Sequence, residues 1–155
     1  MSDPHIIVQD LRLAYGPKEV LHGISFQIQR HEIFGIIGPS QSGKTSLLRC
    51  INRTIDFSAE ASVSGTIAVN GRDVRGLKDV HGLRRRIGMV APLPVGLPLS
   101  IYDNVAFAPR CAGLTNRSQL DGLVEHCLRQ AALWKRSRTA LRAWAPNSRA
   151  ASSRD

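Results

Sequence analysis

A glycine-rich segment at residues 38–45 constrains the fold of this chain more than any other feature of its sequence. The eight residues fit the pattern G-x-x-x-x-G-K-[ST] and read Gly38, Pro39, Ser40, Gln41, Ser42, Gly43, Lys44 and Thr45. A short apolar run at 32–38 leads into the motif, and good helix formers at 47–52 follow it. A loop of this pattern between a buried strand and a helix is typical of α/β proteins that bind phosphate groups.

The residue types of the motif suit the recognition of a polyphosphate. Gly38 and Gly43 allow the backbone to curl so that successive N–H groups point inward, and the start of the following helix adds partial positive charge. Lys44 can reach the β- and γ-phosphates, and the hydroxyl of Thr45 can ligate Mg²⁺. Ser46 is close enough to contact an α-phosphate oxygen. The motif therefore predicts a bound nucleoside triphosphate with magnesium.

The remaining sequence alternates between strand and helix patterns. Apolar and polar residues alternate in the segments expected to form strands, and Gly16-Pro17 and Asn70-Gly71 mark turns between them. Ser100 and Asn116 are N-cap candidates for two helices. The predicted strands are 6–15, 20–29, 32–38, 64–69 and 87–90, and the predicted helices are 79–86, 100–110 and 116–134. Three prolines make the stretch 91–98 a loop.

The net charge of +9 is concentrated at the end of the chain. Residues 134–155 hold six basic side chains and one acidic one, whereas the other 133 residues hold 15 basic and 11 acidic side chains. We therefore predict a folded domain at 1–134 and a basic tail of low order at 135–155. The apolar runs are too short to cross a bilayer, no export signal is seen, and three widely spaced cysteines suggest reduced thiols in the cytosol.

The run from residue 6 to about 133 resembles the ATP-binding subunits of ABC transporters. The segment SIYDNVAFAPR, which follows IGMV, is most similar to the phosphate-import branch. The resemblance implies an α/β P-loop fold with an antiparallel β-subdomain, Mg-ATP as ligand and Tyr15 as the aromatic that stacks on adenine. It also implies that residues 91–110 face transmembrane permease subunits of an importer, that the full-length family forms homodimers, and that the protein lies on the cytoplasmic face of the membrane.

The sequence departs from this family at several positions. Ala91-Pro92 stands where the family carries Phe-Gln, and Gln41 replaces the usual glycine inside the P-loop. No LSGGQ signature, Walker B strand or switch histidine follows, and His126 is interpreted as a surface or core residue of its helix. These features predict a chain truncated before the signature and an incomplete parallel sheet. We expect Mg-ATP binding without useful hydrolysis, and assign no catalytic residue.

Three other interpretations remain open from the sequence. The chain could be a non-functional fragment, since missing parallel strands leave an edge and an apolar face exposed. The basic tail, with Trp134 and Trp144, could bind nucleic acid, although basic tails are more often solvated and we expect no nucleic-acid partner. A small-molecule kinase would suit the chain length, but the strand pair before the P-loop and the placement of Tyr15 do not fit it.

Overall fold

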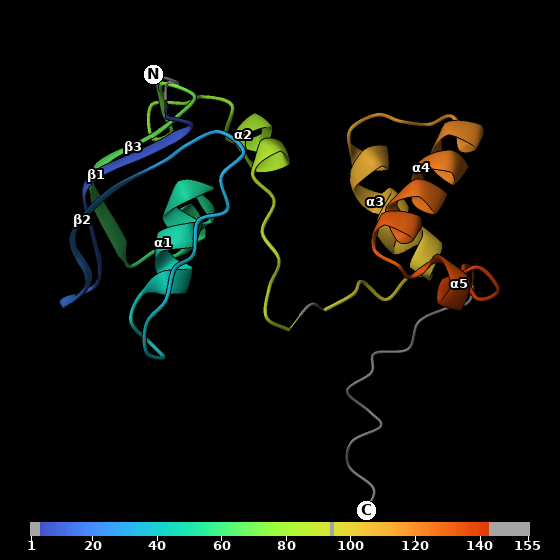
Figure 1. Ribbon diagram of the computed structural model, residues 1–155, viewed down its shortest axis with the longest axis horizontal. Coiled ribbons are helices and arrows are strands. Elements are labelled where there is room, and N and C mark those ends of the chain that lie inside the picture. The colour runs from blue at the N-terminus through green and yellow to red at the C-terminus, as the bar shows by residue number, and fades with distance from the viewer. Residues whose placement is uncertain (1–3, 94, 143–155) are drawn as a thin grey trace, which may run out of the picture. The chain divides into compact units, whose positions relative to one another are not determined.

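The structure is a computed structural model that describes residues 4–93 and 95–142, and the chain divides into two compact units. The first unit extends to Val90 and the second begins at Ala91. Figure 1 shows strands and helices in the first unit and helices in the second. In the described part of the chain, no helix is long and apolar enough to span a membrane.

An antiparallel sheet forms the frame of the first unit. Its strands are β1 (Ile6–Tyr15), β2 (Lys18–Ile28), β3 (Ala61–Val69) and β4 (Arg72–Asp73), in the order β2-β1-β3-β4. The turn at Gly16 and Pro17 joins the first two strands, as predicted. Asn70 and Gly71, with φ of 51° and 71°, connect β3 to β4, because a two-residue hairpin turn needs positive φ at both positions.

A bulge interrupts β1 at its centre. The register between β1 and β3 shifts between the pairs formed by Gln9 and Arg12, and Asp10 has a φ of 45°. The Asp10 N–H donates to the Ser25 hydroxyl of β2 at 2.9 Å, which stabilises the irregular backbone. Gly65, with a φ of 85°, lies against the Asp10 carbonyl on the other side. The bulge therefore depends on a residue without a Cβ in β3.

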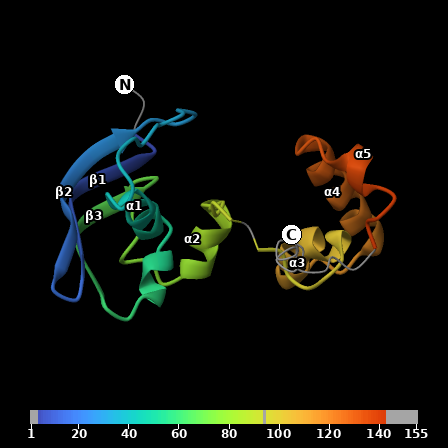
Figure 2. The same cartoon turned by 90° about the horizontal axis from the view of Figure 1, so that it is seen from below.

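Helix α1 (Lys44–Ile51) lies against one face of this sheet in both Figure 1 and Figure 2. Its buried side chains are Leu47, Cys50 and Ile51, which join the apolar cluster formed by the sheet. The sheet contributes the buried residues Val8, Leu11, Leu13, Leu21 and Ile67. Alternation along the strands and the helical spacing on α1 thus supply one common core.

Two short helices complete the first unit. The 3₁₀ helix η1 (Thr54–Phe57) buries Ile55, and helix α2 (Val80–Arg86) buries Leu83. Asp79 caps α2 by accepting from the Gly82 N–H at 2.7 Å. Arg84 joins the two elements, since its guanidinium donates to the Arg53 carbonyl at 2.6 Å.

The second unit is built from helices α3 (Ile101–Cys111), α4 (Arg117–Gln130) and α5 (Trp134–Ser137). The predicted caps are confirmed: Ser100 accepts from the Asp103 N–H and Asn116 from the Gln119 N–H. The buried residues of its own cluster are Tyr102, Ala106, Leu120, Val124 and Leu128. The Tyr102 hydroxyl donates to Asp121 at 2.6 Å and so ties α3 to α4.

Two strand predictions are wrong in this structure. Residues 32–38 and 87–90 form no strand, and Ile33, Ile37 and Val90 are 100%, 98% and 90% exposed. The sequence pattern of a buried parallel strand is present in both segments, but a strand also needs a neighbour to pair with. All strands of the described residues belong to the antiparallel sheet, which these segments do not join.

The end of the described chain is more ordered than its composition suggests. Residues 135–137 lie in α5, where the basic composition predicts low order. Trp134 packs on the α3–α4 cluster beneath the Arg129 guanidinium, 5.2 Å from the ring centroid, and Ser137 is buried. An anchoring aromatic explains the difference, because it offsets the entropy of ordering a short segment. Residues 143–155, including Trp144, lie outside the described residues.

Two glycine substitutions test whether the bulge needs a residue without a Cβ. Gly71, in the β3–β4 turn, is the comparison: Gly71→Ala should lower the free energy of unfolding by about 1 kcal/mol. Alanine there would be strained by the positive φ alone, because nothing lies within 4 Å of the added Cβ. Gly65→Ala should cost roughly 3 kcal/mol or more, because its Cβ would overlap the Asp10 backbone. Thermal unfolding followed by circular dichroism measures both. Equal losses in the two variants would contradict this account of the bulge.

Candidate functional site

The glycine-rich loop leads directly into α1 and packs against the strand β2. Gly43 is the residue before the helix, with a φ of 86° and a ψ of 2°. A Cβ added there would lie 2.8 Å from Leu21 Cδ2 and 3.0 Å from Val20 Cγ1. Position 43 therefore requires glycine for its left-handed backbone and for its close approach to β2.

Lys44 folds back over the loop that precedes it. Its Nζ donates to the Gly38 carbonyl at 2.8 Å, to the Pro39 carbonyl at 2.5 Å and to the Ser42 hydroxyl at 3.3 Å. An ammonium group has three donors, and all three are directed at oxygen atoms of the loop. The positive charge thus lies at the concave side of the loop, where a phosphate oxygen could replace these acceptors.

Gln41 has a left-handed backbone conformation. This conformation is easiest for glycine, the residue that the resembled family usually carries at this position. The φ of Gln41 is 64°, and its side chain is exposed. A left-handed conformation costs a non-glycine residue roughly 1–2 kcal/mol. The Ser42 N–H reaches back to the Pro39 carbonyl at 3.4 Å, so the turn keeps its internal bond despite this residue. Glutamine at position 41 therefore stores some backbone strain in the loop.

Tyr15, at the end of β1, meets the loop through Ser46. The two hydroxyl oxygens are 3.3 Å apart, and either can be the donor. A cavity of about 410 Å³ lies at this meeting point. Its walls come from the strand ends and the loop: Tyr15, Val20, Ser40, Gln41, Ser42, Gly43, Lys44, Thr45 and Ser46.

Six residues of the predicted motif (40–45), together with Ser46 and Tyr15, therefore surround one cavity. Gly38 and Pro39 line a neighbouring cavity of about 310 Å³, together with Ile36 and Ile37. Val20 was not predicted as a site residue. Val20 lines the cavity because the turn at 16–17 places the start of β2 beside the loop.

The hydroxyl of Thr45 is exposed at this cavity, as a cation ligand would need to be. No cluster of three or more His, Cys, Asp or Glu side chains suited to a metal exists among residues 4–93 and 95–142. Magnesium commonly keeps several waters and takes few protein ligands in addition to substrate phosphates. A cation that binds together with a polyphosphate would need few ligands from the loop.

Cys50 anchors the far end of the same helix. Its side chain is 2% exposed within the core between α1 and the sheet. Desolvation by burial raises the pKa of the Cys50 thiol from 9.0 to about 11, partly opposed by the nearby Arg49 charge. The thiol is therefore neutral across the physiological range, and it acts as an apolar packing group rather than as a nucleophile.

The loop, the helix that follows it and the lysine between them define a P-loop nucleotide-binding fold of the α/β class. The family profile described as ABC transporter matches residues 21–148. This chain belongs to the ABC transporter family, and its P-loop fold is that of the family's ATP-binding domain.

Two individual proteins illustrate the similarity. The chain is 40% identical over 137 residues to "Phosphate import ATP-binding protein PstB 2" of Lactobacillus acidophilus, a match that covers 88% of this chain and 55% of that protein. The solved structure of a bacterial Atm1-family ABC exporter with ATP bound superposes with a TM-score of 0.74 at 22% identity, over 93% of this chain and 24% of that chain. The second match supports the fold alone. This chain spans about half the length of the curated relative.

The packing of α1 predicts the reactivity of the cysteines. Cys111 and Cys127 are exposed and Cys50 is buried, so a thiol reagent at pH 8 should modify the first two quickly and Cys50 only after unfolding. The raised pKa adds to this protection, because less than about one hundredth of the Cys50 thiol would be ionised at that pH. Mass spectrometry of tryptic peptides gives the rate for each site. Modification of Cys50 as fast as Cys111 would show that α1 is not packed on the sheet.

Proposed function

We propose that this chain is part of the ATP-binding subunit of an ABC importer. We propose further that it binds Mg-ATP at the P-loop. The observation that carries this proposal is the common cavity of Tyr15, Lys44, Thr45 and Ser46. An aromatic ring, an ammonium group and two hydroxyls at one cavity are the groups that a nucleotide with its cation requires. They come from the end of β1 and the start of α1.

The phosphates would lie along the loop, with the backbone N–H groups at the start of α1 as donors. Lys44 would exchange its bonds to loop oxygens for bonds to the β- and γ-phosphates. Thr45 would hold magnesium through its hydroxyl, and the ion would supply positive charge to the phosphates. Tyr15, which lines the same cavity, would stack on adenine.

Hydrolysis by this chain alone is not expected. The transition state of phosphoryl transfer needs positioned water and stabilised charge on the γ-phosphate. The sequence carries neither an LSGGQ signature nor an acidic pair after an apolar strand, and Ala91-Pro92 stands at the place of the family's glutamine. We therefore propose binding with little or no turnover for the 155-residue chain.

Phosphate is the proposed solute, with transmembrane permease subunits as partners at the cytoplasmic face. The phosphate-import relative, at 40% identity, supports the solute. The partner surface is proposed at 91–110, where Leu93, Val95 and Phe107 are 76%, 67% and 49% exposed. Exposed apolar side chains of this kind suit a protein partner.

Replacement of Lys44 tests the nucleotide site. We expect Lys44→Ala to weaken Mg-ATP binding by roughly ten- to hundredfold, since hydrogen bonds to charged groups contribute about 1.5–3 kcal/mol each. Lys78→Ala is the matched control, because Lys78 is exposed in the same unit and lies outside the cavity. Isothermal titration calorimetry with each variant measures the affinities. Unchanged affinity in Lys44→Ala, or an equal loss in the control, would refute the proposed site.

Two substitutions at Tyr15 separate stacking from hydrogen bonding. Tyr15→Phe removes only the 3.3 Å contact with Ser46 and should leave the affinity for ATP within about threefold of wild type. Tyr15→Ala removes the ring and should cost roughly 1–3 kcal/mol of binding, the usual contribution of an aromatic under a base. Titration with tripolyphosphate is the internal control, because its affinity should not change in either variant. Equal affinities of Tyr15→Ala and wild type for ATP would contradict stacking.

A further inference from the structure

The helical unit contains a second polar cavity, which the nucleotide proposal does not use. It has a volume of about 390 Å³, compared with roughly 30 Å³ for one water in the liquid. Three arginines line it, one from each of three segments: Arg110 at the end of α3, Arg117 at the start of α4 and Arg142 after α5. Of the residues that the structure describes, a single carboxylate, that of Asp103, lines the cavity with them.

The charges in this cavity do not balance. Arg110 forms an ion pair with Asp103 at 2.7 Å, and the pKa of Asp103 is lowered by its bond from Ser100 and by Arg110, so this carboxylate is ionised. For Arg117 and Arg142, no carboxylate partner lies within 4.0 Å among residues 4–93 and 95–142. The neighbouring Asp121, which does not line the cavity, accepts a hydrogen bond from the Tyr102 hydroxyl. The cavity therefore retains a positive surplus.

Two of the guanidinium groups contact the same aromatic ring. Both lie near the Tyr102 ring, Arg110 at 5.6 Å and Arg142 at 5.4 Å from its centroid. Cation–π contact favours each group separately, but two like charges around one ring repel each other. An anion in the cavity would offset the positive charge of the arginines that line it. Contact with Tyr102 thus brings two of the three arginines to the same cavity.

The remaining polar groups suit an oxyanion. The hydroxyl of Thr115 lines the cavity, and no bond to it is found in the described chain. Guanidinium groups present paired N–H donors that match the oxygen spacing of phosphate. We propose that this cavity binds a phosphate dianion, either free or at the end of a larger molecule, through Arg117, Arg142 and Thr115. The proposal does not rest on the function proposed for the P-loop.

The ligand would connect segments that are far apart in sequence. The Leu141 carbonyl already accepts from the Tyr102 N–H at 2.8 Å, so the segment that carries Arg142 lies on α3. Phosphate bound between Arg142 and Arg117 would join this segment to the start of α4. Because a ligand that binds only the folded state stabilises it, the helical unit should resist unfolding more strongly in phosphate.

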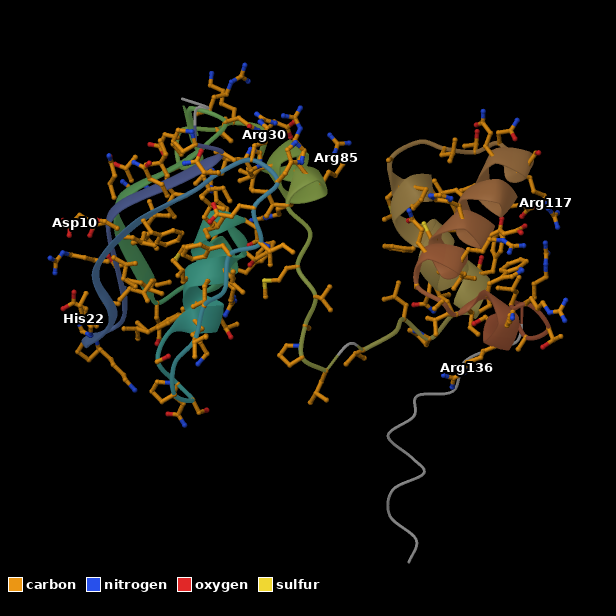
Figure 3. All side chains as sticks on the ribbon, viewed as in Figure 1. Asp10, His22, Arg30, Arg85, Arg117 and Arg136 are labelled. Atoms are coloured by element: carbon orange, nitrogen blue, oxygen red, sulfur yellow. The ribbon has the colours of Figure 1, made fainter. Side chains whose placement is uncertain are left out.

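The test is a titration of the full chain with inorganic phosphate, at constant ionic strength set by chloride and followed by amide chemical shifts. We expect saturable shifts at the amides of Thr115 and Arg117. Arg117→Gln and Arg142→Gln should each weaken this binding about tenfold or more, as loss of a charged hydrogen bond implies. Arg136→Gln is the matched control, since Arg136 is exposed on α5 and outside the cavity; Figure 3 labels Arg117 and Arg136.

The P-loop is a competing phosphate site and is controlled by Lys44→Ala. This variant should lose the shifts at 42–46 and keep those at Thr115 and Arg117. Absence of saturable shifts at Thr115 and Arg117, or a loss in Arg136→Gln equal to that in Arg117→Gln, would overturn the proposal. A parallel titration with glycerol phosphate distinguishes the sources: equal or tighter binding than inorganic phosphate supports a phosphate carried by a larger molecule, and weaker binding supports the free ion.

Discussion

The packing of α1 on the antiparallel sheet is the interaction on which the proposed nucleotide site depends. Leu47, Cys50 and Ile51 bury one side of the helix, and this fixes where its first N–H groups point. Gly43 can approach β2 closely because it has no side chain. A loop held at its C-terminal end in this way loses less freedom when a ligand binds than an unconstrained one, so more of the interaction energy appears as affinity.

Local patterns predicted most of the elements. The alternation in β1, the turn at Asn70-Gly71 and the caps at Ser100 and Asn116 depend on neighbours within a few residues, and each appears where it was expected. The strands predicted at 32–38 and 87–90 failed because a parallel strand depends on a partner elsewhere in the fold. An apolar run indicates that a segment would be stable when buried, but it does not show whether a partner strand is present to pair with it.

The two cavities were predictable to different degrees. The P-loop residues are consecutive, so one sequence motif predicts most of the residues that line the first cavity. Val20 was not predicted and was identified only in the structure. Tyr15 was predicted as a site residue only through a family resemblance, and its contact with Ser46, 31 residues away, was not predicted. Arg110, Arg117 and Arg142 share no motif. The charge pattern placed Arg142 in a solvated tail, because composition cannot show that Leu141 hydrogen-bonds to α3.

The two proposed anion sites attract charge by different physical means. At the P-loop, most donors are backbone N–H groups of fixed direction, and Lys44 supplies one full charge. In the helical unit, the attraction comes from arginine side chains whose surplus charge is partly exposed. Salt screens exposed charges strongly, whereas fixed backbone donors also recognise an anion by their direction. We therefore assign the proposed selectivity for a nucleotide to the P-loop, whereas the arginine cavity would respond to the phosphate concentration and ionic strength of its surroundings.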